Sequence, residues 1–313
     1  MTNENLIKTI AVVGTGVIGA SWATYFLSRG FDVVGTDPGP GAEQKLRDYV
    51  NNSWPLLASR GLVTEASRER LSFTTDMQRA VSSADFVQEN ALEQPEFKAK
   101  LFAEMDEAAP PHSILASSSS SLTMDVIQAN CKNPQRCIIG HPFNPPHIVP
   151  LVEVVGGAKT SEQTIERTMA FYMDIGKKAI RLHKALPGHV ANRLQAALYK
   201  EVLFLLQQGV LNVQDVDHAV SYGPGLRWGV MGPNLQWHLG GGEGGIQHFI
   251  DHLMGSLGSL INSLSGPTID DDLKKAVAAG VLEEAKGRTI AELSDQENKI
   301  MLDILDLRAK ADL

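Results

Sequence analysis

Short apolar runs and amphipathic stretches alternate along the first part of the chain, from residue 7 to about residue 186. The apolar runs predict strands over Thr9–Val13, Asp32–Thr36, Leu71–Thr74, Phe86–Glu89, Ile114–Ser117, Cys137–His141, Pro150–Val155 and Ala179–Leu182. The stretches between them predict helices over Val17–Ser28, Glu43–Ser59, Asp76–Ser82, Glu96–Ala108, Met124–Ala129 and Ser161–Ile175. This alternation is typical of an α/β fold with a mostly parallel, doubly wound sheet, in which ligands bind at the carboxyl ends of the strands.

The pattern changes after Pro187-Gly188, because no further strand signal follows. Apolar residues at helical spacing predict helices over Val190 to Gln208, Val213–Ser221, Gly245–Met254 and Asp270 to the C-terminus. We therefore expect two domains, 1–187 with the sheet and 188–313 with helices alone. Helices this apolar that have no sheet to cover usually bury a face against a partner subunit, so we expect a homodimer formed through the second domain.

A glycine-rich turn, Gly14-Thr15-Gly16-Val17-Ile18-Gly19, follows the first predicted strand. The first glycine permits a tight turn, the second lets a pyrophosphate approach the backbone, and the third lets helix and strand pack closely. Unpaired N–H groups at the helix start, near Val17 and Ile18, would face the phosphates. A purely structural turn is the alternative. The strand before the turn, the helix after it and an acid downstream favour a Rossmann-type dinucleotide site.

The downstream acid is Asp37, which closes the second apolar run eighteen residues after Gly19. A carboxylate at this place accepts hydrogen bonds from the ribose hydroxyls and repels a 2′-phosphate. The next residues, Pro38-Gly39-Pro40-Gly41, include no arginine or lysine that could receive that phosphate. The sequence therefore predicts NAD, rather than NADP, as the cofactor.

Composition narrows the class of protein further. The chain has 313 residues, 28 of them basic and 36 acidic, which gives a formal net charge of −8 without any basic block. This argues against a nucleic-acid partner or an anionic membrane. No apolar run approaches the roughly 20 residues needed to cross a bilayer, and the polar N-terminus does not resemble a signal peptide. The two cysteines, Cys131 and Cys137, have the spacing of neither a zinc site nor a redox pair, so we expect a reduced, cytoplasmic protein.

The candidate chemistry begins at His141, at the end of a predicted strand. Oxidation of an alcohol needs a base that takes the hydroxyl proton while hydride leaves, and a histidine suits this near neutral pH. Twelve residues later Glu153 lies inside the apolar run Val152–Val155, where a carboxylate is rarely buried without a partner. A His–carboxylate pair would explain both residues. The alternative is a structural histidine and a glutamate that binds backbone or arginine, because spacing alone does not show that the side chains meet.

Two further patterns bear on the chemistry of the chain. The serine run Ser117–Ser121 ends another strand at the same edge of the sheet, where its hydroxyls could bind a substrate oxygen or cap the next helix. It contains no G-x-S-x-G elbow, so a nucleophilic serine is not expected. His248 and His252 are four residues apart but lack the H-E-x-x-H pattern, so no metal is expected.

Several of these motifs occur in the order typical of one family. They are Gly14/Gly16/Gly19, Ala116–Leu122 (ASSSSSL), His141–Pro145 (HPFNP), Pro150–Glu153 (PLVE) and Pro187-Gly188 followed by Asn192-Arg193. With this set, from about residue 7 to 250, the chain resembles the 3-hydroxyacyl-CoA dehydrogenase family. Within the family it is most similar to the branch that acts on small free 3-hydroxy acids such as L-carnitine and L-gulonate.

The resemblance implies roles for residues around the reacting atoms. His141 matches the family's catalytic base, Glu153 its carboxylate partner, Ser120 the serine that binds the substrate oxygen and Asn192 the asparagine that completes the site, while Glu93 and Lys98 match residues near the nicotinamide ribose. The family arrangement implies cofactor on the first domain and dimerisation through the helical second domain.

The sequence departs from the acyl-CoA members at Ser118, where those typically carry asparagine, and this weakens a thioester substrate. Arg227, in the turn Gly223–Arg227, would offer a free carboxylate a bidentate charged partner, or else form a salt bridge at an interface. Aromatic residues near Arg227 would favour a trimethylammonium group, because that cation binds a π face. Tyr222, Trp228 and Trp237 are candidates for such contacts, or simply core or interface residues.

Together these observations predict NAD-dependent oxidation of a small free 3-hydroxycarboxylate to the 3-oxo acid. L-Carnitine is the first expected substrate, L-gulonate the second and a 3-hydroxyacyl-CoA the third. An NAD-binding protein with a purely structural role is the alternative from another class. The buried charge pair expected of His141 and Glu153, together with Ser120, argues against it, since packing alone does not need such a pair.

Overall fold

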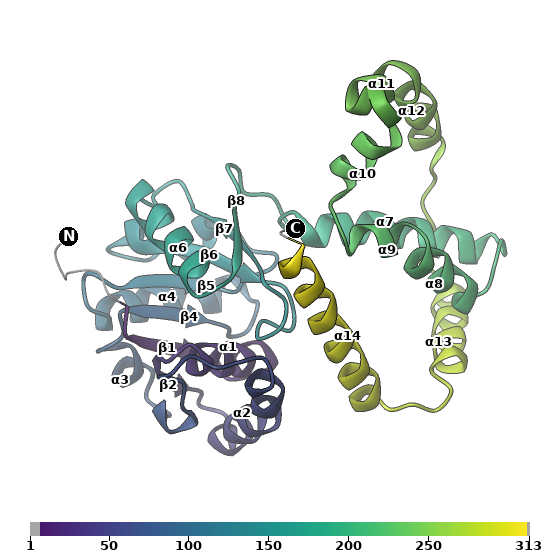
Figure 1. Cartoon of the computed structure of the whole chain (residues 1–313). Helices are drawn as coiled ribbons and strands as arrows, with labels where there is room; N and C mark the ends of the chain where they lie inside the picture. The colour runs from purple at the N-terminus through teal and green to yellow at the C-terminus, as the bar shows by residue number, and fades with distance from the viewer. Residues whose placement is uncertain (1–6, 312–313) are drawn as a thin grey trace. The chain divides into compact units, whose positions relative to one another are not determined.

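The computed structural model describes residues 7–311, and the chain divides into two compact units, residues 1–192 and 193–313 (Figure 1). The domain boundary predicted after residue 187 falls in the connection between the last strand and the first long helix of the second unit. Each unit is described by itself below.

The first unit is built on one eight-stranded sheet. Its strands are β1 (Thr9–Val13), β2 (Asp32–Thr36), β3 (Leu71–Thr74), β4 (Phe86–Glu89), β5 (Ile114–Ser117), β6 (Cys137–Pro142), β7 (Leu151–Val155) and β8 (Lys178–Arg181). They lie in the order β3-β2-β1-β4-β5-β6-β7-β8, and every neighbouring pair is parallel except β6 and β7. The predicted doubly wound, mostly parallel sheet is confirmed. Its order reverses at β1, so the loops after β1 and β4 border the crevice where such sheets bind ligands.

Helices cover both faces of this sheet (Figure 1). They are α1 (Val17–Ser28), α2 (Ala42–Ala58), α3 (Met77–Val81), α4 (Pro95–Ala108), α5 (Met124–Ile127) and α6 (Glu162–Asp174), with short 3-10 helices at Arg68–Arg70 and Pro134–Arg136. Alternate residues of a strand enter different cores: Ile10 and Val12 pack with α1, α2 and α6, whereas Ala11 and Val13 pack with α3, α4 and α5. Both faces of β1 are therefore apolar, which explains its unbroken apolar run.

The second unit contains only helices among residues 193–311. They are α7 (Ala191–Gln207, which begins at the end of the first unit), α8 (Val213–Tyr222), α9 (Pro224–Trp228), α10 (Pro233–Gly240), α11 (Gly245–His252), α12 (Met254–Ser263), α13 (Asp271–Ala285) and α14 (Ile290–Lys310), with a 3-10 helix at Gly242–Gly244. The helical stretch predicted from Asp270 is two helices, because Lys286 and Gly287 both take left-handed backbone and Thr289 caps α14. Its last two residues, 312 and 313, lie outside the described part of the chain.

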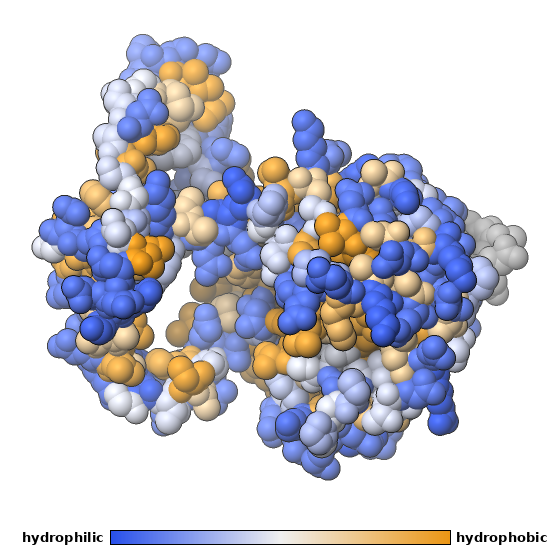
Figure 2. Space-filling model, turned by 180° about the vertical axis from the view of Figure 1, so that it is seen from behind, coloured by the Kyte–Doolittle hydropathy of each residue, from blue (hydrophilic) through white to orange (hydrophobic). Residues whose placement is uncertain are grey.

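Apolar side chains remain exposed on the second unit. Figure 2 shows them gathered in several places, including the lobe of α10, α11 and α12, where Leu253, Met254, Leu260, Ile261 and Leu264 are exposed. Exposed apolar patches of this kind mark surfaces that bury against another molecule. Within residues 7–311, no helix has both the length and the apolar content needed to cross a membrane.

Candidate active site

The glycine turn after β1 has the geometry of a phosphate cradle. Gly14 takes a left-handed φ of +82°, and a Cβ there would stand 2.9 Å from the backbone of Asn90 and Ala91. A Cβ on Gly19 would stand 1.9 Å from the carbonyl oxygen of Gly14. At Gly16 a Cβ would meet no atom of the protein within 4 Å. Packing thus explains the first and third glycines, whereas the second leaves open space beside the backbone that a pyrophosphate fits.

The start of α1 completes this cradle. Gly16 is its N-cap, no side chain caps the helix and its first turn carries no acid. The backbone N–H groups at Val17 and Ile18 therefore remain available at the positive end of the helix dipole, which favours an anion. The residues present fit the pyrophosphate of a dinucleotide.

Asp37 follows the end of β2 beside the same turn. Its Oδ2 accepts a hydrogen bond of 2.9 Å from the backbone N–H of Thr15, and its Oδ1 accepts one of 2.8 Å from Gly39. Asp37 is half-buried, so the carboxylate both fixes the turn and keeps an accessible edge. It lies where an acid would bind ribose hydroxyls.

The structure brings His141 and Glu153 together. They are direct register partners in the antiparallel pair of β6 and β7, and His141 Nδ1 lies 2.8 Å from Glu153 Oε2. His141 is 6% exposed and Glu153 is 0% exposed. Facing residues of antiparallel strands have neighbouring side chains, so the sheet itself makes this pair.

Glu153 is held as a carboxylate by three donors. Besides His141 on Oε2, its Oε1 accepts the backbone N–H groups of Val190 at 2.8 Å and Ala191 at 2.9 Å, where α7 begins. Burial acts to raise the pKa of Glu153, but these hydrogen bonds outweigh it and lower the pKa. An ionised Glu153 makes His141 Nδ1 the protonated nitrogen, so Nε2 of the neutral ring is free to accept a proton.

In the serine run Ser117–Ser121, at the end of β5, one hydroxyl makes no hydrogen bond with a described residue. Four of its members bond within the protein: Ser117 to Glu89, Ser118 to Asn90, and both Ser119 and Ser121 to Glu93. The Ser120 hydroxyl has no hydrogen-bond partner among the described residues, and its side chain is half-buried. No serine of the run is the N-cap of α5, because that position is Thr123, which makes no side-chain cap. Ser119 Oγ nevertheless accepts the N–H of Leu122 at 3.1 Å, just before the helix.

Glu93 is the anchor of this serine turn. Its Oε1 accepts the hydroxyls of Ser119 and Ser121 and the backbone N–H groups of Ser120, at 3.0 Å, and Ser121, at 2.9 Å. Burial acts to raise the pKa of Glu93, but these bonds and the Lys98 charge lower it to about 2. Glu93 is thus ionised near neutral pH.

Lys98 lies beneath the turn rather than open to a ligand. It is 1% exposed, and its Nζ donates to both oxygens of Glu89, at 2.7 and 2.9 Å, and to the carbonyl of Ala91 at 3.2 Å. Its Nζ also stands 3.4 Å from Glu93 Oε2. Glu89 was not predicted as a site residue, because a glutamate at the end of a strand gives no sequence signal of a bond to a buried lysine nine residues on.

Of the other predicted site residues, Asn192 lies near Glu153 in the first unit and Arg227 lies in the second unit. Asn192 is half-buried in the first turn of α7, one residue after the N–H that binds Glu153. Arg227 belongs to the second unit, in α9, where it is exposed and its guanidinium forms no ion pair with a described residue. His189 was not predicted. Its ring centroid lies 5.0 Å from that of His141.

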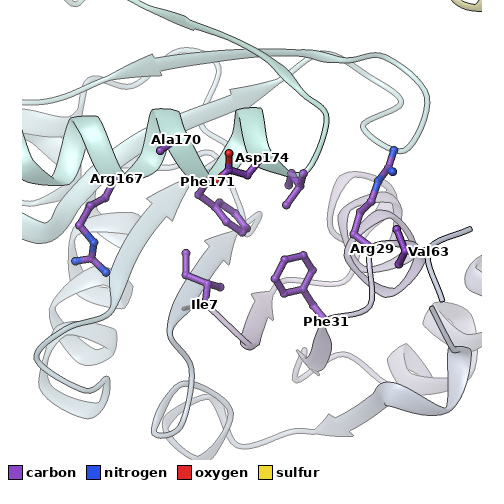
Figure 3. A pocket seen from close by; sticks show the side chains of 9 residues that line it. Ile7, Arg29, Phe31, Val63, Arg167, Ala170, Phe171 and Asp174 are labelled. Carbon is purple, nitrogen blue, oxygen red and sulfur yellow. The ribbon is translucent and has the colours of Figure 1, made fainter. Parts of the chain in front are cut away.

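A cavity of about 540 Å³ lies elsewhere in the first unit (Figure 3). Ile7 and Phe31, which line it, precede β1 and β2, so it opens at the amino ends of these strands. Ligands of doubly wound sheets bind at the opposite edge. The cavity is therefore separate from the glycine turn and the His141–Glu153 pair.

Among residues 7–311, no group of three or more histidine, cysteine, aspartate or glutamate side chains is arranged to hold a metal ion.

A doubly wound sheet with this glycine cradle, together with a buried His–carboxylate pair, defines an NAD-dependent dehydrogenase acting on a CH–OH group. The chain belongs to the 3-hydroxyacyl-CoA dehydrogenase family. The family's NAD binding domain matches residues 9–185, and its C-terminal domain matches residues 188–292. NAD is the cofactor.

Relatives of known activity are similar over nearly the whole chain. An L-carnitine dehydrogenase of Streptomyces coelicolor is 43% identical, covering 97% of this chain and 96% of that protein. An L-carnitine dehydrogenase of Bacillus cereus is 40% identical, covering 98% and 94%. Among solved structures, an FHMPC 5-dehydrogenase described as an NAD⁺-dependent dismutase matches with a TM-score of 0.83 at 28% identity, covering 97% of this chain and 99% of that one.

Proposed function

We propose that the protein oxidises the 3-hydroxyl of L-carnitine to the 3-oxo acid. The observation that carries the chemistry is the buried His141–Glu153 pair, since it provides a base with a fixed tautomer. The choice of substrate rests on similarity to relatives named L-carnitine dehydrogenase. A serine at Ser118 in place of the asparagine of acyl-CoA enzymes agrees with a free acid.

His141 is the base in the proposed reaction. His141 Nε2 takes the proton of the substrate's 3-hydroxyl, and Glu153 stabilises the imidazolium that forms. Ser120, whose hydroxyl is unengaged, binds the reacting oxygen, and Asn192 completes the contacts to it. As the O–H bond breaks, the C3–H bond gives up its hydride and the C3–O bond becomes a carbonyl. Bound NAD supplies the hydride acceptor.

The dinucleotide would be held by the glycine turn, Asp37 and Glu93. The pyrophosphate would lie against Gly14, Gly16, Val17, Ile18 and Gly19, and Asp37 would accept the adenosine ribose hydroxyls. Glu93 would face the nicotinamide ribose, with Lys98 acting through it because the ammonium is covered.

Arg227 is proposed to bind the substrate carboxylate, and this gives a testable prediction. The change Arg227→Met should raise KM for L-carnitine about 10- to 100-fold, the effect of losing a charge-assisted hydrogen bond, with the Kd of NADH unchanged. Initial-rate kinetics and NADH fluorescence titration measure the two quantities. Lys299→Met removes another exposed cation of the second unit and serves as the control. Equal KM values for wild type, Arg227→Met and Lys299→Met would refute the role.

The experiment that tests the function is a substrate panel. NADH formation is followed with L-carnitine, L-gulonate, 3-hydroxybutyrate and 3-hydroxybutyryl-CoA at matched concentrations. We expect the highest kcat/KM with L-carnitine. A higher value with any of the other three overturns the substrate, and NADH binding without turnover of any compound favours a structural role.

We also infer a homodimer that buries the exposed apolar side chains of the second unit, and a cytoplasmic location in which Cys131 and Cys137 stay reduced. Sedimentation equilibrium at micromolar concentration tests the dimer, and a monomer mass there would contradict it. Fractionation of the cells that produce the protein tests the location.

A further inference from the structure

His189 is buried and combines two unfavourable features at one position. It is 2% exposed, its Nδ1 is a buried nitrogen with no hydrogen-bond partner among the described residues, and its φ is +48°. A buried polar atom without a partner and a left-handed backbone at a residue other than glycine each cost on the order of 1 kcal/mol or more. Such costs persist where a function needs them, and this position lies 5.0 Å, centroid to centroid, from the ring of His141.

The side chain of His189 reaches the serine turn. Its Nε2 lies 2.9 Å from the carbonyl oxygen of Ser119. A carbonyl only accepts, so Nε2 carries the proton and Nδ1 holds a lone pair. Burial lowers the pKa of His189, which favours this neutral ring. The bonded carbonyl belongs to the peptide that leads into Ser120, so the ring fixes the backbone from which the Ser120 side chain projects.

The backbone of His189 serves the other half of the site. Directly after its left-handed turn, the N–H groups of Val190 and Ala191 both donate to Glu153 Oε1. Two consecutive N–H groups that point at one oxygen occur where the chain bends sharply, as successive backbone amides do in anion-binding nests. This arrangement occupies Oε1 and leaves Oε2 to His141.

We propose that His189 is a positioning residue that holds the Ser120 turn and the His141–Glu153 pair in register with each other. Its ring fixes one of them and its backbone fixes the other. The role assigned to Ser120 rests on the proposed function, whereas the two sets of hydrogen bonds do not. A neutral ring also leaves His141 as the imidazole that receives the substrate's proton, because a second cation 5.0 Å away would oppose its protonation.

Two variants separate the donor from the bulk of the ring. His189→Gln keeps an N–H donor at the reach of Nε2, whereas His189→Phe keeps the ring volume and loses the donor. Both replacements place a residue other than glycine in the left-handed backbone of this position, as the wild type does. We expect kcat with L-carnitine to fall about 10- to 100-fold in His189→Phe, because the Ser119 carbonyl is left unpaired, and to recover to within about fivefold of wild type in His189→Gln. KM and the Kd of NADH should change less than about threefold.

Hydrogen exchange gives a readout that needs no substrate. In His189→Phe we expect faster exchange in peptides that contain Ser119–Ser121 and in those that contain Val190 and Ala191, with both near wild type in His189→Gln. His147→Phe is the control, because it replaces another buried histidine of the same unit, one bonded to Ser21. It should cost stability while leaving exchange in these peptides unchanged.

The outcomes are distinct. Equal kcat and equal exchange in the Phe and Gln variants would overturn the positioning role, as would exchange changes confined to the Ser119–Ser121 peptides. If the wild type fails to turn over L-carnitine, the proposed substrate is wrong, while the exchange comparison still decides the role of His189.

Discussion

Replacing His141 by glutamine is expected to lower kcat for L-carnitine by about 10²- to 10⁴-fold, the usual contribution of a general base. Glutamine can still donate to Glu153 through its amide, but it has no nitrogen that takes a proton from the substrate hydroxyl. The Kd of NADH should change less than about twofold, because the glycine cradle and Asp37 are untouched. Stopped-flow formation of NADH gives kcat, and fluorescence titration gives Kd.

His183→Gln provides the control, since His183 is exposed after β8. Its kcat should match that of the wild type. A His141→Gln enzyme that keeps more than a tenth of wild-type kcat would show that another group accepts the proton. In that case the hydrogen bond between His141 on β6 and Glu153 on β7 is structural, and His141 is not the base.

The strands of the first unit could be predicted from the sequence because both faces of the sheet are covered. The inner strands are then apolar runs such as Ile10–Val13, whereas the edge strands β3 and β8 are partly exposed, and the helices between strands bury apolar side chains against the sheet. The helices of the second unit were harder to predict. Helices α9, α10 and α12 bury no residue of their own within the described chain, so no apolar periodicity reveals them. Prolines at the first turns of α9 and α10 are start signals, but the glycines around them indicate turns equally well.

In the candidate site, too, some residues could be predicted from the sequence and others could not. His141 and Glu153 could be singled out because each is a polar residue in an apolar strand, yet their meeting depends on the antiparallel register of β6 and β7, which twelve residues of spacing do not fix. The residue pattern of the serine run did not predict which hydroxyl is free, and only the family resemblance pointed to Ser120. The other four hydroxyls bond to Glu89, Asn90 and Glu93, at and after the end of β4. His189 could not be found, because its importance lies in a backbone angle and two partners far away in the sequence.

Glu153→Gln tests the other half of the pair and is expected to act on both rate and stability. Three donors face the two oxygens of Glu153, and a carboxamide has only one oxygen, so at least one buried donor loses its partner. We expect kcat to fall about 10²-fold or more, because the His141 tautomer is no longer fixed. Removing one partner of a buried pair should lower the free energy of unfolding by about 3 kcal/mol near pH 7, as measured by urea titration.

The pH dependence of that stability loss gives a second check. Glu153 has a lower pKa in the folded protein than the ordinary value of about 4.3, so its contribution is complete above the unfolded pKa and is lost as pH falls through the folded pKa. The difference in unfolding free energy between wild type and Glu153→Gln should therefore shrink in acid. Glu162→Gln, which removes the charge of an exposed pair with Arg181, should leave the free energy of unfolding close to that of the wild type, because solvent screens exposed pairs. If Glu153→Gln unfolds like Glu162→Gln and keeps its kcat, then the carboxylate is not what orients the imidazole.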